Sequence, residues 1–343
     1  MERENILITG GCGFIGSNFI KHLLSSSKNF RIINMDNLTY AGNLNNLKDF
    51  WDDPNLSFEK LDINNYNDMV NLFDELEINR VVHFAAETHV DTSIRSPNTF
   101  FKTNVMGTQN ILECCRKQGI ECFIQVSTDE VYGSLAGIQE PPFKEPNCLK
   151  PNNPYSASKA AADLLVRAYK KTYDLPAIIT RCSNDYGPRQ FPEKLIPVVI
   201  LNALNNKPIP LYGDGSNIRD WIYVEDHCRA LTAVLNRGKH GEIYNFGGGG
   251  EEKSNLEIIE MILNIMDKPR NLIKFVEDRK GHDFRYSMDF SKASKDLGWN
   301  PIISLHEGLT RTVNWYLDNQ EWVKHIKTKQ YKTSYQEYLD HVK

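Results

Sequence analysis

The sequence lacks the features that mark several classes of protein. No stretch approaches the roughly 18 consecutive apolar residues of a membrane-spanning helix. The 343 residues include 40 basic and 44 acidic side chains, which give a net charge of −4, and no block of like charge stands out. A surface built mainly to bind nucleic acid or an anionic membrane is therefore not expected. Internal repeats and low-complexity linkers are also lacking.

Cysteine is scarce, and its spacing suits neither a disulfide framework nor a metal site. The chain has seven cysteines, an odd number, and no Cys-x-x-Cys pair. Its nine histidines are scattered without the spacing of metal ligands. This pattern favours reduced thiols and predicts no structural metal. Because the sequence also shows no signal-peptide core, we expect a cytoplasmic protein.

What is present is the composition of an ordinary globular protein, with 41% hydrophobic and 24% charged residues. In the first half, short β-branched segments such as Asn5–Thr9 alternate with helical patterns. This alternation predicts right-handed βαβ units and hence an α/β fold, a Rossmann-type doubly wound parallel sheet. After about residue 183 glycine, proline and asparagine become frequent and the alternation breaks.

The break in pattern predicts two lobes with the active cleft between them. We place the Rossmann domain at residues 1–182, with a returning segment near 217–248. Residues 183–343 are expected to form mainly a smaller, partly interleaved α/β lobe for the substrate, followed by a C-terminal tail.

A glycine motif lies directly between the first expected strand and the first expected helix. Gly10 and Gly13 suit a tight turn close to a pyrophosphate, and Gly16 suits close packing of helix on strand. Asp36 follows about 20 residues after the last glycine, where a carboxylate binds the adenine ribose and repels a 2′-phosphate. The motif therefore favours NAD over NADP, and the alternative of a turn that binds nothing is disfavoured. Asp62 and Ile63, which end the third strand, are expected beside the adenine.

A second motif begins a helix at Tyr155. Asn153 can cap this helix and Pro154 fits its first position. Tyr155 and Lys159 are four residues apart, so both project from one face of the helix. A nearby ammonium and the charge of a nicotinamide would lower the pKa of the tyrosine, which could then act as a base toward an alcohol. The alternative is an incidental Tyr–Lys pair on a surface helix.

Two adjacent acids follow the expected strand at residues 123–127. Asp129 and Glu130, after Thr128, stand at the carboxyl end of that strand, where parallel sheets bind ligands. Both can reach one substrate only if the strand has already turned, because neighbours on a strand point to opposite faces. Since paired carboxylates repel, one pKa should rise, leaving one neutral acid and one charged base, as the elimination of water requires. The alternative is a solvated acidic turn.

These motifs belong to longer stretches that match one family. From Ile6 to about Trp322 the chain resembles the nucleotide-sugar 4,6-dehydratases, in the extended short-chain dehydrogenase/reductase superfamily. The glycine and Tyr-x-x-x-Lys motifs occur throughout that superfamily, whereas the Thr-Asp-Glu triplet is far more specific. The other matching stretches are residues 36–43, 85–91, 128–133, 181–184, 190–197, 211–215, 219–221 and 278–283.

The resemblance implies a lyase that uses NAD catalytically on a glucose nucleotide. Tyr155, supported by Lys159, would deprotonate the 4-hydroxyl as hydride leaves C4, and Thr128 would hydrogen-bond that oxygen. Glu130 would then remove the C5 proton while Asp129 protonates the departing 6-hydroxyl. Hydride returns to C6 and gives a 4-keto-6-deoxy sugar. Because the cofactor ends as it began, it is expected to stay tightly bound.

The resemblance also implies residues that bind the two ligands. Those expected at the cofactor, beyond the residues named above, are Phe14, Ile15, Asn37, Leu38, Thr39, Ala85, Ala86 and Thr103. Those expected at the substrate are Thr88, Asn184, Lys194, Leu195, Pro210, Tyr212, Arg219, Asn255, Arg279 and His282. A homodimer is expected through the helices near residues 98–118 and 155–173.

Some positions depart from the family pattern, and the nucleotide base stays open between thymidine and uridine. Thr92, Asp185, Arg189 and Lys280 stand where the family usually has arginine, asparagine, tyrosine and proline. The substrate is then dTDP-glucose or, as in UDP-rhamnose synthesis, UDP-glucose. A UDP-sugar 4-epimerase is a second hypothesis, which needs Tyr155 and Lys159 but gives Asp129 and Glu130 no role. A non-catalytic NAD-binding scaffold is the third hypothesis.

Overall fold

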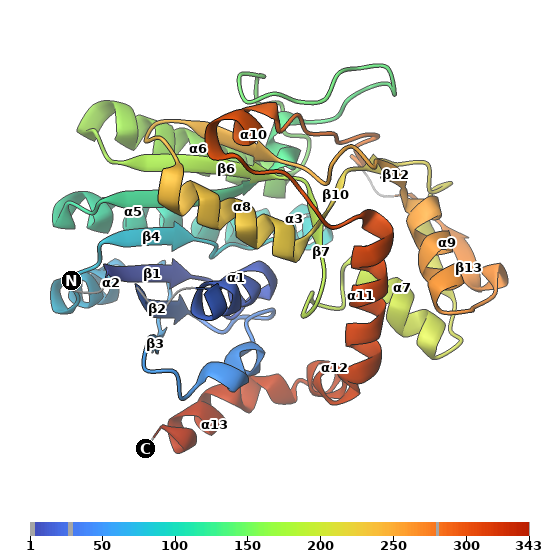
Figure 1. The fold of residues 1–343 in the computed structure, drawn as a ribbon, viewed down its shortest axis with the longest axis horizontal. Coiled ribbons are helices and arrows are strands. Elements are labelled where there is room, and N and C mark those ends of the chain that lie inside the picture. Colours follow the sequence, from blue (N-terminus) through green and yellow to red (C-terminus); the bar gives the residue numbers. More distant parts are fainter. Residues whose placement is uncertain (1–3, 27–29, 279–280, 343) are drawn as a thin grey trace.

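The computed structural model describes residues 4–26, 30–278 and 281–342, and its centre is a seven-stranded sheet (Figure 1). All neighbouring strands pair in parallel, in the order β11-β6-β5-β4-β1-β2-β3. This confirms the predicted fold class. The strands are β1 (Glu4–Thr9), β2 (Phe30–Asp36), β3 (Leu56–Lys60), β4 (Arg80–His83), β5 (Cys122–Thr128), β6 (Ala177–Cys182) and β11 (Ile243–Phe246).

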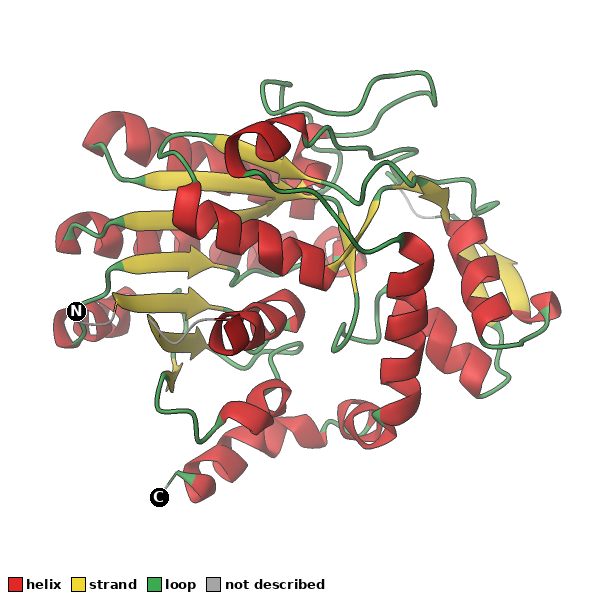
Figure 2. Cartoon of the chain, in the orientation of Figure 1, coloured by secondary structure: helices red, strands yellow, loops and turns green. Residues whose placement is uncertain are grey.

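Helices cover both faces of the sheet, so its strands are apolar on both sides. Along β1, Ile6 and Ile8 pack with α1 (Phe14–Ser26), α8 (Val224–Arg237) and α10 (Ser291–Leu297). Leu7, which points the other way, packs with α2 (Tyr66–Glu75), α5 (Thr108–Gln118) and α6 (Pro154–Tyr173). Figure 2 shows these two helical layers around the yellow strands. The two cores hold the carboxyl ends of all the strands at one edge.

Short elements connect the main ones on the way to that edge. A 3-10 helix, η1 (Leu44–Phe50), follows β2, and another, η3 (Asp129–Tyr132), follows β5. Between β4 and α5 the chain forms α3 (Val90–Arg95), α4 (Pro97–Phe100) and a π-helical segment, η2 (Phe101–Gly107). The predicted helix near 98–118 is thus one run of three elements.

The second lobe has its own core and small sheets. Its helices are α7 (Leu195–Leu204), α9 (Asn255–Ile265) and α11 (Leu305–Asp318), with η4 (Arg270–Leu272). The strand pairs are β7 (Asn184–Tyr186) with β10 (Trp221–Tyr223), β8 (Ile209–Tyr212) with β13 (Ile273–Val276), and β9 (Ile218–Arg219) with β12 (Lys253–Ser254). Between these pieces the chain returns to the first lobe, where α8 packs on α1 and β11 completes the sheet.

The C-terminal segment crosses from the second lobe back to the first. It consists of α12 (Gln320–Lys327), η5 (Gln330–Thr333) and α13 (Ser334–His341), and Figure 1 shows this red segment leaving α11 and running toward the side of β3. Its last helix packs against η1. Among the described residues, none of the helices combines the length and the apolar character needed to span a bilayer.

Candidate active site

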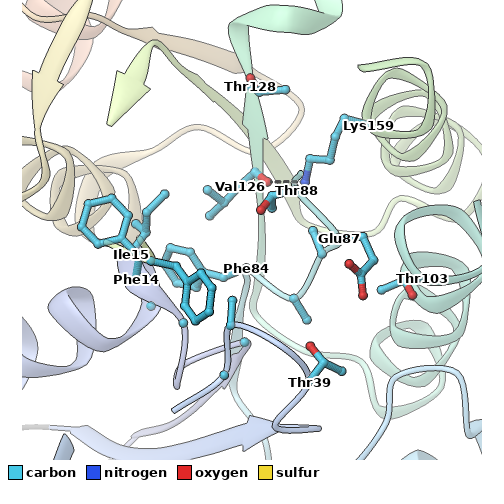
Figure 3. A pocket seen from close by; sticks show the side chains of 18 of the residues that line it. Phe14, Ile15, Thr39, Phe84, Glu87, Thr88, Thr103, Val126, Thr128 and Lys159 are labelled. Atoms are coloured by element: carbon cyan, nitrogen blue, oxygen red, sulfur yellow. Dashed lines mark hydrogen bonds between the residues drawn. The ribbon is translucent and has the colours of Figure 1, made fainter. Parts of the chain in front are cut away.

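A cavity of about 500 Å³ lies at the carboxyl edge of the sheet, where the two lobes meet. Its walls come from the β1–α1 turn, the ends of β2, β4 and β5, the start of α6 and the segment after β6. Figure 3 shows Phe14 and Ile15 on one side of this cavity, with Thr103 and Lys159 on the other. This is the position in which open parallel sheets bind ligands.

The glycine turn fits a dinucleotide because side chains are excluded from it. A Cβ on Gly10 would lie 2.7 Å from the backbone nitrogen of Ala85, and Gly10 has a φ of +70°. A Cβ on Gly16 would lie 2.4 Å from the carbonyl oxygen of Gly10. Gly13 is less crowded, with one contact at 3.3 Å, and it lines the cavity with Gly10 and Gly16. The turn and the start of α1 thus offer backbone N–H groups to a pyrophosphate.

Asp36 ends β2 at the cavity wall and is held by two backbone donors. Its carboxylate accepts hydrogen bonds from the N–H of Cys12 (2.9 Å) and the N–H of Leu38 (2.8 Å). Burial raises the pKa of Asp36, and the two N–H groups oppose that rise. The remaining lone pairs suit the two hydroxyls of a ribose, so the site fits NAD.

The other expected cofactor residues are distributed as follows. Leu38 does not belong to the lining of this cavity, and it supports Asp36 through its N–H instead. The lining includes Phe14, Ile15, Asn37, Thr39, Asp62, Ile63, Ala85, Ala86 and Thr103.

The local sequence sets the start of α6, where the Tyr–Lys pair lies. Asn153 accepts from the N–H of Ser156 at 2.9 Å and its own N–H is bonded to the Ser156 hydroxyl, which forms a capping box. Tyr155 and Lys159 are 8% and 5% exposed and both line the cavity. The ammonium of Lys159 donates to the carbonyl of Val126 at 2.8 Å, the dashed contact in Figure 3.

Burial is the main influence on the pKa values of this pair. Burial lowers the pKa of Lys159 to about 8. Burial also raises the pKa of Tyr155 well above its ordinary value, and the charges of Glu130 and Asp129 raise it further. Without the nicotinamide charge, which the prediction also includes, the groups around Tyr155 therefore raise its pKa. The physical reason is that the phenol is desolvated and faces two carboxyl groups.

The two acids reach the same cavity because β5 ends at Thr128. The chain turns there into η3, and both Asp129 and Glu130 line the cavity. The Thr128 hydroxyl donates to Asp129 Oδ1 at 3.1 Å and accepts from the Glu130 N–H at 3.3 Å. Asn153 donates to Glu130 Oε2 at 3.3 Å.

The two acids have unequal environments. Asp129 is 2% exposed, and its Oδ2 has no hydrogen-bond partner within the described part of the chain. Burial and then the charge of Glu130 raise its pKa well above the ordinary value. Burial also raises the pKa of Glu130, but Lys194 and Asn153 oppose that rise. We predicted that one pKa would rise; both do, and more strongly at Asp129, which makes it the neutral acid of the pair.

The structure separates the expected substrate residues into two groups. Thr88, Asn184 and Lys194 line the cavity, and the Lys194 ammonium donates to the carbonyl of Thr88 at 3.0 Å. The remaining ones with described positions lie outside that lining: Leu195, Pro210, Tyr212, Arg219, Asn255 and His282. Arg279 lies outside the described residues.

The second group lies in the second lobe. Arg219 stacks over Tyr286 at 4.4 Å and donates to the carbonyl of Asp283 at 2.9 Å. Burial raises the pKa of Glu130, and the charge of Arg219 is among the effects that oppose that rise. The rings of Tyr212 and His282 pack edge to face at 6.4 Å.

Sequence reasoning missed several lining residues. Tyr40 donates to Glu193 Oε1 at 2.9 Å, and Glu87 and Phe191 lie in the same wall. These four residues lie in stretches that match the family, but the resemblance implies no role for them.

The structure also brings together three potential metal ligands that the sequence did not single out. His227 Nδ1 lies 3.0 Å from both carboxylate oxygens of Asp185, and Cys182 completes the group, with one ligand atom of each residue within 4.8 Å of the others. The sequence predicted no metal site, and 42 residues of separation between Asp185 and His227 hide the group from any spacing rule.

Comparisons with known proteins agree with this geometry. A family model described as GDP-mannose 4,6 dehydratase matches residues 7–312. A dTDP-glucose 4,6-dehydratase of Neisseria gonorrhoeae is 48% identical over 338 residues, which cover 93% of this chain and 97% of the relative. The structure of a dTDP-glucose 4,6-dehydratase from Bacillus anthracis in complex with NAD aligns with a TM-score of 0.88 at 47% identity, covering 94% of this chain and 99% of that one. A UDP-glucose 4-epimerase from Thermotoga maritima with UDP-glucose aligns with a TM-score of 0.85 at 30% identity, covering 92% and 99%.

Proposed function

The chain belongs to the nucleotide-sugar 4,6-dehydratase family, and from this premise we propose that it is an NAD-dependent hydro-lyase that converts dTDP-glucose to dTDP-4-keto-6-deoxyglucose. The observation that carries the proposal is the pair Asp129 and Glu130, which shares one cavity with Tyr155 and Lys159. A 4-epimerase needs only the second pair. Water elimination needs both.

The first step is oxidation at C4. When bound, NAD⁺ supplies the acceptor for the C4 hydride and later the donor of that hydride to C6. Tyr155 takes the proton of the 4-hydroxyl, and Thr128 orients that oxygen. Because burial and two carboxyl groups raise the pKa of Tyr155 in the protein alone, we assign the opposing effect to the positive charge of the oxidised cofactor. Lys159, held on Val126, adds a positive charge at the same wall.

The second step is loss of water between C5 and C6. Oxidation at C4 makes the C5 proton acidic, and Glu130 removes it. Asp129, whose raised pKa keeps it protonated, gives its proton to the departing 6-hydroxyl, which leaves as water. Glu130 then returns the proton to C5 as C6 is reduced.

The proton balance connects the two steps. Each turnover leaves an extra proton on Tyr155 and removes one from Asp129, so the site must be reset before the next cycle. The Thr128 hydroxyl donates to Asp129, and Thr128 and Tyr155 line the same cavity, so we propose that this hydroxyl connects the group that gains the proton to the group that loses it.

The remaining residues are proposed to bind different parts of the substrate. We propose that Lys194 and Arg219 are the cations that contact the diphosphate, which suits bidentate contact by the guanidinium. Tyr212 and His282 are proposed for the base, with Pro210, Asn255 and Arg279. Thr88, Asn184 and Leu195 complete the proposed substrate set.

The proposal is tested by incubating the purified protein with dTDP-glucose and, in parallel, with UDP-glucose, with no NAD added, and recording masses. We expect dTDP-glucose to lose 18 mass units, the mass of one water. An unchanged mass, or an isomer of equal mass, from protein shown to contain NAD would refute the dehydratase assignment. Equal turnover of both nucleotides would refute selectivity for the thymidine base.

We also propose a homodimer, because the helices expected at its interface carry exposed apolar side chains. Phe101 and Met106 of η2 are 42% and 53% exposed, and Leu164 of α6 is 57% exposed. Light scattering of Leu164→Asp should then give a monomer, whereas Leu317→Asp, on α11, should leave the dimer intact.

The seven cysteine thiols are unpaired, which supports a location in a reducing compartment such as the cytoplasm.

A further inference from the structure

The C-terminal segment docks on the cofactor lobe through aromatic rings. Tyr338 of α13 packs edge to face on Trp51 at 5.5 Å and on Phe58 at 5.7 Å, and Tyr335 also packs on Phe58. The ring of His341 lies 2.8 Å from Asp52 through Nε2. The segment begins on α11 of the second lobe, so these contacts tie that lobe to the side of the sheet that ends at β3.

One residue of this segment reaches the rim of the cavity. Tyr331 of η5 is 4% exposed, and its hydroxyl donates to the backbone carbonyl of Tyr40 at 2.7 Å. Its ring lies 6.2 Å from that of Phe191, which in turn lies 5.6 Å from the ring of Tyr40. We call Tyr40, Phe191 and Tyr331 the rim cluster. Its members come from the cofactor lobe, the second lobe and the C-terminal segment.

Tyr40 connects the rim cluster to the cofactor side and to the substrate side of the cavity. It lies in the segment 36–43, which also contributes Asp36 and Thr39 to the cavity. Its hydroxyl donates to Glu193 Oε1 at 2.9 Å, next to Lys194. Burial, and then the charge of Glu193, raise the pKa of Tyr40, so it stays a neutral donor. Tyr331 therefore anchors a residue that joins the cofactor segment to the substrate lobe by a side-chain hydrogen bond at this rim.

We propose that Tyr331 is a positioning residue that retains the cofactor through the reaction cycle, by fixing Tyr40 and with it the segment 36–43 over the NAD site. This inference rests on the proposed function, because a lyase that borrows hydride must keep the reduced cofactor until the hydride is returned. If NADH left early, each aborted cycle would release one NADH and leave one sugar nucleotide oxidised at C4.

The first test measures cofactor release without any substrate. Tyr331→Phe removes only the hydroxyl, and Tyr335→Phe is the matched control, since Tyr335 is in the same segment but contacts Phe58 and Lys60. Each variant is saturated with NAD, freed of excess by gel filtration, and followed by ultrafiltration and assay of NAD in the filtrate over time. We expect Tyr331→Phe to release NAD roughly three- to tenfold faster, the range that one neutral hydrogen bond supports, and the control to match the wild type.

The second test follows the reduced cofactor during turnover of dTDP-glucose. Tyr331→Phe should release NADH into the filtrate in equal amount to the oxidised sugar nucleotide, lose activity with time, and recover it when NAD is added. Wild type and Tyr335→Phe should release no NADH into the filtrate and should keep their activity. A release rate of NAD in Tyr331→Phe within twofold of the wild type would overturn the proposal, and so would equal acceleration in both variants. If none of the proteins dehydrates dTDP-glucose, the proposed function fails while the release rates still decide the role of Tyr331.

Discussion

Asp129→Asn removes the proposed acid and keeps the shape of the side chain. The Thr128 hydroxyl can still donate to the amide oxygen, so C4 oxidation should persist. Elimination should fail, because an amide cannot supply the proton that the 6-hydroxyl needs on leaving. A positioned general acid contributes about 10² to 10⁴ in rate, or roughly 3 to 5 kcal/mol of barrier.

The structure places the expected loss in the upper part of that range. Asp129 is 2% exposed, so water has little access to replace it as the proton donor. We therefore expect the elimination step to slow by about 10³ to 10⁴. Replacing a buried acid whose Oδ2 has no hydrogen-bond partner among the described residues should leave the melting temperature unchanged or slightly higher.

The assay separates the two steps. In stopped flow with dTDP-glucose, absorbance at 340 nm should rise in Asp129→Asn toward one NADH per site and decay slowly, while quenched samples show little 4-keto-6-deoxy product. Asp74→Asn, on the exposed face of α2, is the control and should behave as the wild type. Product formation within tenfold of the wild type would refute the assignment of Asp129 as the acid. Equal loss of the 340 nm rise and of product would refute it as well.

Three further predictions follow from other groups. Glu130→Gln should stop exchange of the C5 proton with D₂O, read by NMR of the sugar, and lower turnover by about 10² to 10⁴; exchange at the wild-type rate would show another base. Asp36→Asn should narrow the preference for NAD over NADP by at least about tenfold in binding titrations, because the carboxylate that repels the 2′-phosphate is gone; an unchanged ratio would contradict its role. Burial raises the pKa of Asp220 to about 7, so the folded protein holds the Asp220 proton more tightly than the unfolded chain does. The stabilisation that comes from this difference should be complete below about pH 4 and should fall by about 4 kcal/mol as the pH rises to about 7. Asp220→Asn should remove this slope from urea unfolding measured across that range, and the same slope in the variant would refute the assignment.

The features that the sequence predicted correctly are those that a local pattern of residues determines. The alternation around β1 and α1 gave the parallel sheet, and the glycines between them required a close turn, as the short distances at Gly10 and Gly16 show. The capping residues Asn153 and Pro154 placed the start of α6 correctly. The turn after Thr128 had to exist if two neighbouring acids were to share a site, and η3 supplies it.

What the sequence could not predict depends on contacts between distant segments. The pKa of Tyr155 has a direction set by burial and by Glu130, which no spacing rule contains. Leu38 supports Asp36 with its N–H, whereas the family resemblance implied that Leu38 lies at the cofactor itself. Tyr331 reaches Tyr40 across 291 residues. The role that we propose for the C-terminal segment rests on that contact, which no pattern in the sequence indicates.

The central claim is that one site carries hydride from C4 to C6 of the same sugar while Glu130 and Asp129 eliminate water. The most direct measurement uses dTDP-glucose labelled with deuterium at C4, turned over in ordinary water, with the product examined by NMR and mass spectrometry. The account predicts a product 18 mass units lighter than the labelled substrate, with the deuterium at C6. Deuterium that returns to C4, or that is lost to water, would contradict it.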